Sequence, residues 1–149
     1  MSLQKVDRIS ILCKRKPGIS EDEFHNYWAN HHGPLCQELL CKYGIIKYNQ
    51  FHITPEYKDK LAAFGVQAPS YDGMAEFLVH RFEDMVTFFT APEYLEKIRP
   101  DELKFVDQDT IIFLAGVDYV VVDNNKPVVH KGDSAFSDRR MKNIYPSKL

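Results

Sequence analysis

Cysteine is scarce in this chain of 149 residues, which contains only Cys13, Cys36 and Cys41. These cysteines form no Cys-x-x-Cys pair, and any disulfide pairing would leave one thiol free, as is typical of a reducing compartment. We therefore expect buried free thiols and a cytoplasmic protein. A chain of this length can bury a sufficient core without disulfides or a structural metal.

Export signals, long apolar segments and a basic surface are missing as well. Residues 1–10 lack the apolar centre of a signal peptide, and the strongest apolar run, residues 111–122, is too short and too interrupted to span a bilayer. The formal net charge is −2, which provides no general basic field for phosphates. We therefore expect no membrane or nucleic-acid partner, and small molecules or other proteins remain as ligands.

The common cofactor and metal motifs are also absent. No GxGxxG or GxxxxGK segment occurs, and the six histidines show neither HxxxH nor HExxH spacing. The adjacent residues His31 and His32 would point their rings apart on a helix, which does not suit a shared metal ion. We expect no nicotinamide, flavin or nucleotide cofactor and no metal site.

The chain does contain a regular alternation of strand-like and helix-like segments. β-branched and aromatic residues bounded by turn residues predict strands at residues 6–13, 45–53, 73–80 and 110–122. Residues 54–72 have no sustained period and are expected to form a long loop, which could cover a pocket.

Capping signals and apolar periodicity predict the helices between these strands. A capping box of Ser20 and Glu23 begins the first helix, which Gly33-Pro34 ends before a second helix at residues 34–43. Residues 83–89 carry a buried stripe, and a second capping box at Thr90 begins a helix that Arg99-Pro100 terminates.

The order strand, helix, strand, strand, helix, strand is the split βαβ pattern. It predicts an α+β, ferredoxin-like domain whose four-stranded antiparallel sheet carries helices on one face. A second copy would cover the other face, so we predict a homodimer with the architecture of a dimeric α/β barrel. We assign residues 1–122 to this domain and residues 123–149 to a C-terminal extension that could pack on the partner subunit.

Several short motifs occur between residues 14 and 94: Lys14-Arg15-Lys16-Pro17-Gly18-Ile19-Ser20, Phe24-His25, Tyr27-Trp28, His31-His32-Gly33-Pro34-Leu35, Tyr48-Asn49-Gln50, His52, Tyr71-Asp72-Gly73-Met74-Ala75-Glu76 and Pro92-Glu93-Tyr94. Together they resemble EthD-domain proteins of the dimeric α/β-barrel superfamily. The resemblance covers roughly four-fifths of the chain. It is strongest towards small fungal enzymes of aromatic polyketide pathways, which decarboxylate or dehydrate precursors such as atrochrysone carboxylic acid.

Helical spacing places His31 on the same arc as Phe24, Tyr27 and Trp28, with His32 at its flank. We expect His31 to point inward and to transfer protons. The alternative is a structural histidine that caps its own helix or bonds to a backbone carbonyl.

Two further predicted strands carry polar residues with catalytic potential. Tyr48, Gln50 and His52 alternate on one strand face and would line a cavity, unless that face is simply solvated. Glu76 lies within the third strand, where a carboxylate must be paired, protonated or solvated, and pairing with His31, His32 or His52 would orient the imidazole and raise its basicity. The catalytic candidates are thus His31, His52 and Glu76, and the substrate-binding candidates are Tyr27, Trp28, His32, Tyr48, Gln50 and Phe113; Asp72, Asp107 and Asp109 are interpreted as turn and strand-end residues.

The residues and the resemblance together imply a cofactor-independent lyase in polyketide secondary metabolism. Decarboxylation of an aromatic polyketide acid is the first hypothesis, and dehydration needs the same acid and base. A cofactor-free monooxygenase or a cyclase acting on a polyketide is one alternative. A non-catalytic binding or accessory protein is another, because one fold hosts many functions.

Overall fold

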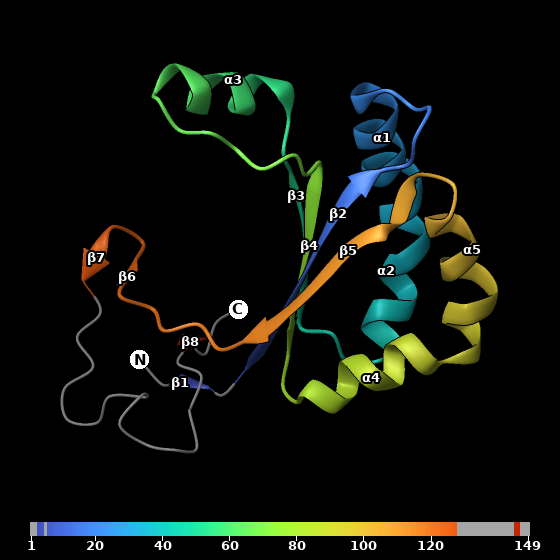
Figure 1. The fold of residues 1–149 in the computed structure, drawn as a ribbon. Coiled ribbons are helices and arrows are strands. Elements are labelled where there is room, and N and C mark those ends of the chain that lie inside the picture. The colour runs from blue at the N-terminus through green and yellow to red at the C-terminus, as the bar shows by residue number, and fades with distance from the viewer. Residues whose placement is uncertain (1–2, 5, 128–144, 147–149) are drawn as a thin grey trace.

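The computed structural model describes residues 3–4, 6–127 and 145–146. A four-stranded antiparallel sheet in the order β3-β4-β2-β5 forms its centre (Figure 1). This order confirms the predicted ferredoxin-like, α+β domain. The strands are β2 (Asp7–Arg15), β3 (Lys47–His52), β4 (Gly73–Val79) and β5 (Val106–Gly116).

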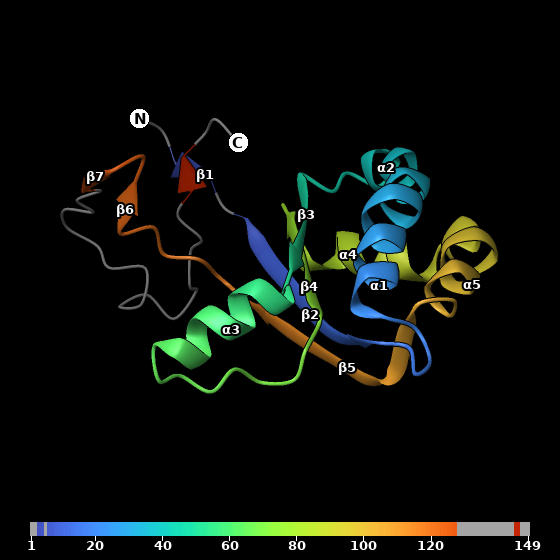
Figure 2. The ribbon, with the colours of Figure 1, turned by 90° about the horizontal axis from the view of Figure 1, so that it is seen from above.

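The two helical regions that connect these strands pack on one face of the sheet (Figures 1 and 2). A further helix, α3 (Pro55–Ala63), lies apart from them on the other side of the sheet. The first region comprises α1 (Glu21–Tyr27), η1 (Trp28–His32) and α2 (Gly33–Lys42), and the second comprises α4 (Phe82–Thr90), η2 (Tyr94–Ile98) and α5 (Arg99–Glu102).

The core lies between this sheet face and the two helical regions, in two apolar clusters. In one cluster, Ile9 and Phe77 of the sheet pack against residues of α2 and α4. In the other, Phe24 and Trp28 pack against Phe105 just before β5. Full burial of such side chains stabilises the fold by about 1.5–3 kcal/mol each, so these clusters fix the position of both helical regions.

The first helical region does not end at Gly33-Pro34, contrary to the prediction. Gly33 keeps helical backbone angles (φ −55°, ψ −56°), and its N–H donates to the carbonyl of Trp28, five residues back. The π-helical turn η1 therefore joins α1 to α2. Pro34 stands in the first turn of α2, where its missing N–H is tolerated.

The prediction of a structureless loop at residues 54–72 is wrong for its first half, which forms α3. Pro55 in the first turn suits a helix start. No residue of α3 is buried, so its apolar side chains follow no core-facing period that would reveal a helix.

The second helical region also departs from the prediction at both ends. The Thr90 hydroxyl donates to the Val86 carbonyl at 2.8 Å, so it closes α4 instead of capping the next helix. The chain continues through Arg99-Pro100 into α5, because Pro100 occupies the first turn. The final strand, β5, begins at Val106 and ends at Gly116, earlier at both ends than predicted.

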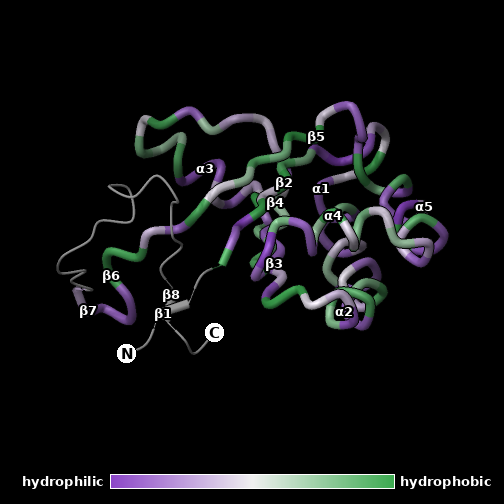
Figure 3. Tube along the Cα trace, turned by 90° about the horizontal axis from the view of Figure 1, so that it is seen from below, coloured by the Kyte–Doolittle hydropathy of each residue, from purple (hydrophilic) through white to green (hydrophobic). Residues whose placement is uncertain are grey.

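The sheet face away from the core carries exposed apolar residues. Ile111 and Phe113 line the interior, so the alternate residues Ile112 and Leu114 point to the other face, where they are 41% and 49% exposed. Figure 3 shows hydrophobic residues along this part of β5 and hydrophilic ones along β3. The sheet is therefore covered on one side by this chain's core helices and offers an apolar strip on the other.

Two short strand pairs complete the described structure. β6 (Val122–Asp123) and β7 (Lys126–Pro127) form a hairpin, and β1 (Leu3–Gln4) pairs with β8 (Tyr145–Pro146). Most of the C-terminal extension at residues 123–149 lies outside the described residues, so its packing on a partner stays a prediction. No helix in the described ranges is long and apolar enough to cross a bilayer. All three cysteines are free, but Cys41 is exposed, contrary to expectation.

Gly73, at the start of β4, lies directly beneath the Trp28 ring, which a Cβ atom at this position would overlap. We expect Gly73→Ala to lower the free energy of unfolding by about 1–3 kcal/mol, because overpacking forces neighbouring groups to move. Urea titration measures this change. Gly116→Ala is the matched control, since its added methyl group would meet nothing within 4 Å. Equal unfolding midpoints for both variants would contradict the close contact.

Candidate functional site

A cavity of about 690 Å³ lies between the sheet and the core helices. This volume suits a ligand of several fused rings. Its walls are mainly apolar and aromatic, and include Ile11, Trp28, Phe77, Phe88, Phe89 and Phe113. The polar groups that reach it include His32, Tyr48, Tyr94, Arg99, Glu102 and Gln108.

His31 does not point inward, contrary to the prediction. Its side chain is exposed and stacks on Tyr27, with the ring centroids 5.1 Å apart. Its neighbour His32 is only 5% exposed and lines the cavity. The π-helical turn explains the exchange, because its wider turn rotates later side chains by about one position relative to an α-helix.

Asp101 of α5 holds His32 in place. Its carboxylate lies 2.9 Å from His32 Nδ1 and also accepts a hydrogen bond from the Tyr27 hydroxyl. Burial lowers the pKa of His32, although Asp101 opposes this effect. Burial tends to raise the pKa of Asp101, but the hydrogen bonds from Tyr27 and His32 bring it below its usual value. At neutral pH the carboxylate is ionised and the imidazole is uncharged.

This arrangement fixes the tautomer of His32. An ionised carboxylate only accepts hydrogen bonds, so Nδ1 must carry the proton and Nε2 is an acceptor. Cys36 Sγ lies 3.4 Å from Nε2, and burial raises the pKa of that thiol to about 12, so it remains protonated and its S–H is a weak donor to Nε2. The site can therefore accept a proton at Nε2, with Asp101 ready to stabilise the resulting imidazolium.

The polar row of β3 faces the core helices, but only Tyr48 lines the cavity, whereas Gln50 and His52, which we expected there, do not. Gln50 Nε2 donates to the Trp28 carbonyl at 2.9 Å, and its Oε1 lies 3.0 Å from His52 Nε2. The other ring nitrogen of His52 lies 2.8 Å from His25 Nδ1. His52 thus belongs to a separate polar cluster, which does not contribute to the cavity wall.

Glu76 does not pair with His31, His32 or His52, so it orients none of these imidazoles. It forms an ion pair with Arg8, whose Nη1 lies 3.0 Å from Asp118. Glu76 alternates with residues 75 and 77, which face the cavity, and therefore points to the opposite side of the sheet.

Of the other predicted binding residues, Trp28 and Phe113 line the cavity, whereas Tyr27 and Gln50 do not. Phe113 is 62% exposed and packs edge-on against Phe89, with the ring centroids 6.1 Å apart. Within the described parts of the chain, no group of three or more potential ligands could hold a metal ion. The sequence reasoning missed Tyr94, Arg99, Asp101, Glu102 and Gln108. For Asp101 and Glu102 a signal was available, because these two adjacent carboxylates lie between the apolar residues Ile98 and Phe105.

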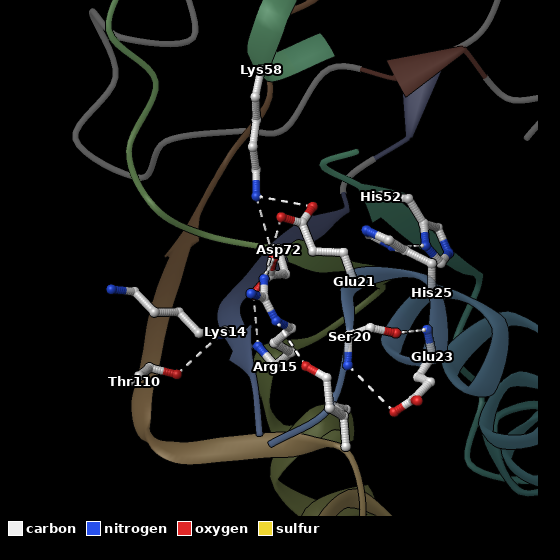
Figure 4. A network of polar contacts seen from close by, with 11 residues as sticks. Lys14, Arg15, Ser20, Glu21, Glu23, His25, His52, Lys58, Asp72 and Thr110 are labelled. Atoms are coloured by element: carbon white, nitrogen blue, oxygen red, sulfur yellow. Dashed lines mark hydrogen bonds and ion pairs between the residues drawn. The ribbon is translucent and has the colours of Figure 1, made fainter. Parts of the chain in front are cut away.

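A second polar cluster surrounds Asp72, which is 3% exposed and is more than the turn residue we expected (Figure 4). Asp72 accepts hydrogen bonds from the Arg15 backbone at 2.8 Å and from the Arg15 guanidinium at 3.0 Å. Lys58 of α3 lies 3.3 Å from Asp72 and 3.5 Å from Glu21 of α1. Although burial opposes it, the pKa of Asp72 is lowered by Arg15 and Lys58. These ion pairs connect α3 to the rest of the domain.

The strand order, the one-sided helical layer and the internal cavity define a ferredoxin-like protein with room for a ligand. Residues 16–109 match the EthD domain, and the chain belongs to the EthD family. The conidial pigment biosynthesis dehydratase EthD of Metarhizium robertsii is 32% identical over 126 residues, which cover 80% of this chain and 87% of that protein.

Other similar proteins extend the range of functions and support the fold. The decarboxylase claH of Passalora fulva is 30% identical over 103 residues, covering 66% of this chain and 67% of that protein. A dimeric protein of unknown function and ferredoxin-like fold from Bacteroides fragilis matches with a TM-score of 0.54 and 11% identity, covering 77% of this chain and 98% of that one. This structural match shows the fold alone.

The paired histidines predict a loss of stability in mild acid. Burial lowers the pKa of both His25 and His52 below the ordinary value of 6.5. Below about pH 6.5 the unfolded chain therefore binds more protons at these histidines than the folded chain does. The free energy of unfolding falls as pH drops through this range. We expect the melting temperature to fall by a few degrees between pH 7.5 and 5.5, and less steeply in His52→Gln. Identical slopes for the two proteins would contradict the assignment.

Proposed function

We propose that this protein is a cofactor-independent lyase that eliminates water or carbon dioxide from an aromatic polyketide acid of the atrochrysone carboxylic acid type. The observation that carries the proposal is the His32–Asp101 pair at the wall of a largely apolar cavity. Membership of the EthD family and its similarity to a fungal dehydratase and a fungal decarboxylase support an enzymatic role in secondary metabolism.

The protonation state of His32 favours dehydration as the first reaction to test. The aromatic walls hold a polycyclic substrate and exclude water, while His32 Nε2 removes a proton from the carbon next to a carbonyl group. Asp101 orients the ring and stabilises the imidazolium, which then protonates the departing β-hydroxyl group. Decarboxylation would instead require a proton donor after carbon dioxide leaves, and an uncharged His32 with a lowered pKa is less suited to that task.

The two adjacent histidines provide a direct test. We expect His32→Gln to lower turnover by about a hundredfold or more, because it removes the proton-transfer group. His31 is exposed and adjacent in sequence, so His31→Gln should keep wild-type turnover. Mass spectrometry would follow the loss of 18 or 44 mass units from an aromatic polyketide incubated with metal-stripped protein under argon.

Other outcomes of this assay point to other functions. Equal losses in both variants would contradict the assignment of the base to His32. Activity that begins only after air is admitted would favour the monooxygenase. Tight binding of the polyketide without any turnover would favour a non-catalytic binding protein. Melting curves would show whether His32→Gln still folds.

We also propose that two copies associate through the open sheet face. Exposed Phe51, Ile112 and Leu114 would be buried there, and the similar Bacteroides fragilis protein is described as dimeric. Light scattering at micromolar concentration should give about twice the chain mass of 17.3 kDa. Leu114→Lys should shift the protein to a monomer, whereas Val66→Lys, at a comparably exposed position, should not. A monodisperse wild-type monomer would refute this assembly.

A further inference from the structure

A second set of polar side chains lines the cavity and takes no part in the proton transfer described above. The Tyr94 hydroxyl donates to both carboxyl oxygens of Glu102, at 2.9 and 3.0 Å. Arg99 Nη1 lies 3.5 Å from Glu102 and also donates to Oε1 of Gln108. These four residues come from η2, α5 and β5, and all of them line the cavity.

Arg99 determines which way the Gln108 amide is oriented. A guanidinium group only donates hydrogen bonds, so the atom that faces it must be the carbonyl oxygen Oε1. The amide nitrogen Nε2 is then directed elsewhere. It is buried and has no hydrogen-bond partner in the described structure. A buried donor without a partner is unfavourable, which indicates that an acceptor atom belongs at this point.

We infer that Gln108 Nε2 binds the ketone oxygen of the substrate and stabilises the enolate that forms there. This inference rests on the proposed function. The amide is well placed for the task because Arg99, which is itself paired with Glu102, holds it in one orientation. Oriented donors stabilise charge that develops on oxygen during a reaction.

The elimination then balances as follows. His32 Nε2 takes the proton from the carbon next to the ketone, and the electron pair moves onto the oxygen that Gln108 holds. The pair returns, a carbon–carbon double bond forms and the bond to the β-hydroxyl oxygen breaks. The leaving hydroxide takes the proton from the imidazolium and departs as water, which restores the uncharged His32.

The surroundings of Gln108 suit a developing negative charge. Burial raises the pKa of Glu102, although Tyr94 and Arg99 oppose this effect. The guanidinium of Arg99 donates to Gln108 Oε1, and its positive charge beside the amide favours the enolate over the ketone.

Binding of 2-naphthol, an aromatic alcohol whose anion absorbs at longer wavelength, tests this inference without turnover. We expect Gln108→Met to weaken binding about tenfold and to raise the pKa of the bound naphthol relative to the wild-type complex. Gln67→Met, at an exposed position outside the cavity, is the matched control and should match the wild type. Gln108→Glu is a second variant in case Gln108→Met does not fold. It keeps an acceptor for Arg99 but removes the donor, so we expect the same weakening of naphthol binding.

The outcomes separate this inference from the proposed function. Unchanged naphthol binding and ionisation in both Gln108 variants would overturn the inference, as would failure of the wild type to bind millimolar 2-naphthol. If naphthol binding does not depend on Gln108 but His32→Gln abolishes turnover, the lyase function holds and the role of Gln108 is refuted. If naphthol ionisation depends on Gln108 but the wild type turns over no polyketide ketone, the oxygen-binding site stands and the lyase function fails.

Discussion

The hydrogen bond from the Gly33 N–H to the Trp28 carbonyl maintains a π-helical turn on which the geometry of the cavity depends. It places one residue more in that turn than an α-helix would. As a result His32 faces Asp101 and the cavity, while His31 faces solvent. Trp28 itself fits only because Gly73 has no side chain beneath it. The Gly33–Trp28 hydrogen bond thus turns His32 towards the cavity, and Gly73 leaves room for the Trp28 ring beside it.

The fold could be predicted from sequence because its signals are local. Alternating strands bounded by turns gave the ferredoxin-like order, and the Ser20–Glu23 capping box forms as expected, with hydrogen bonds of 3.1 and 3.3 Å. The site could be predicted only in part. Trp28, His32, Tyr48 and Phe113 do line the cavity. The predicted orientation of His31 failed because a shift by one residue inside a helix leaves no mark in apolar periodicity.

Asp101 and Gln108, which the sequence reasoning missed, owe their roles to side-chain contacts that residue spacing alone does not reveal. Asp101 meets His32 across a separation of 69 residues, and Gln108 gains its significance from Arg99. Glu76 shows the converse, since its neighbours in sequence face the cavity while it reaches Arg8 on the other side of the sheet. The role of a polar residue in a strand therefore depends on which face it occupies, and an error of one position reverses the interpretation.

Helix α3 buries none of its own residues, and Lys58 forms the ion pairs that join it to Glu21 and Asp72 of the domain. Its docking is therefore governed by electrostatics and owes little to apolar packing. Displacing α3 would leave the two core clusters intact, so the free energy that separates its docked and released positions should be small beside that of unfolding. Ionic strength weakens such pairs while leaving buried apolar contacts in place. Salt concentration thus acts on this one helix selectively.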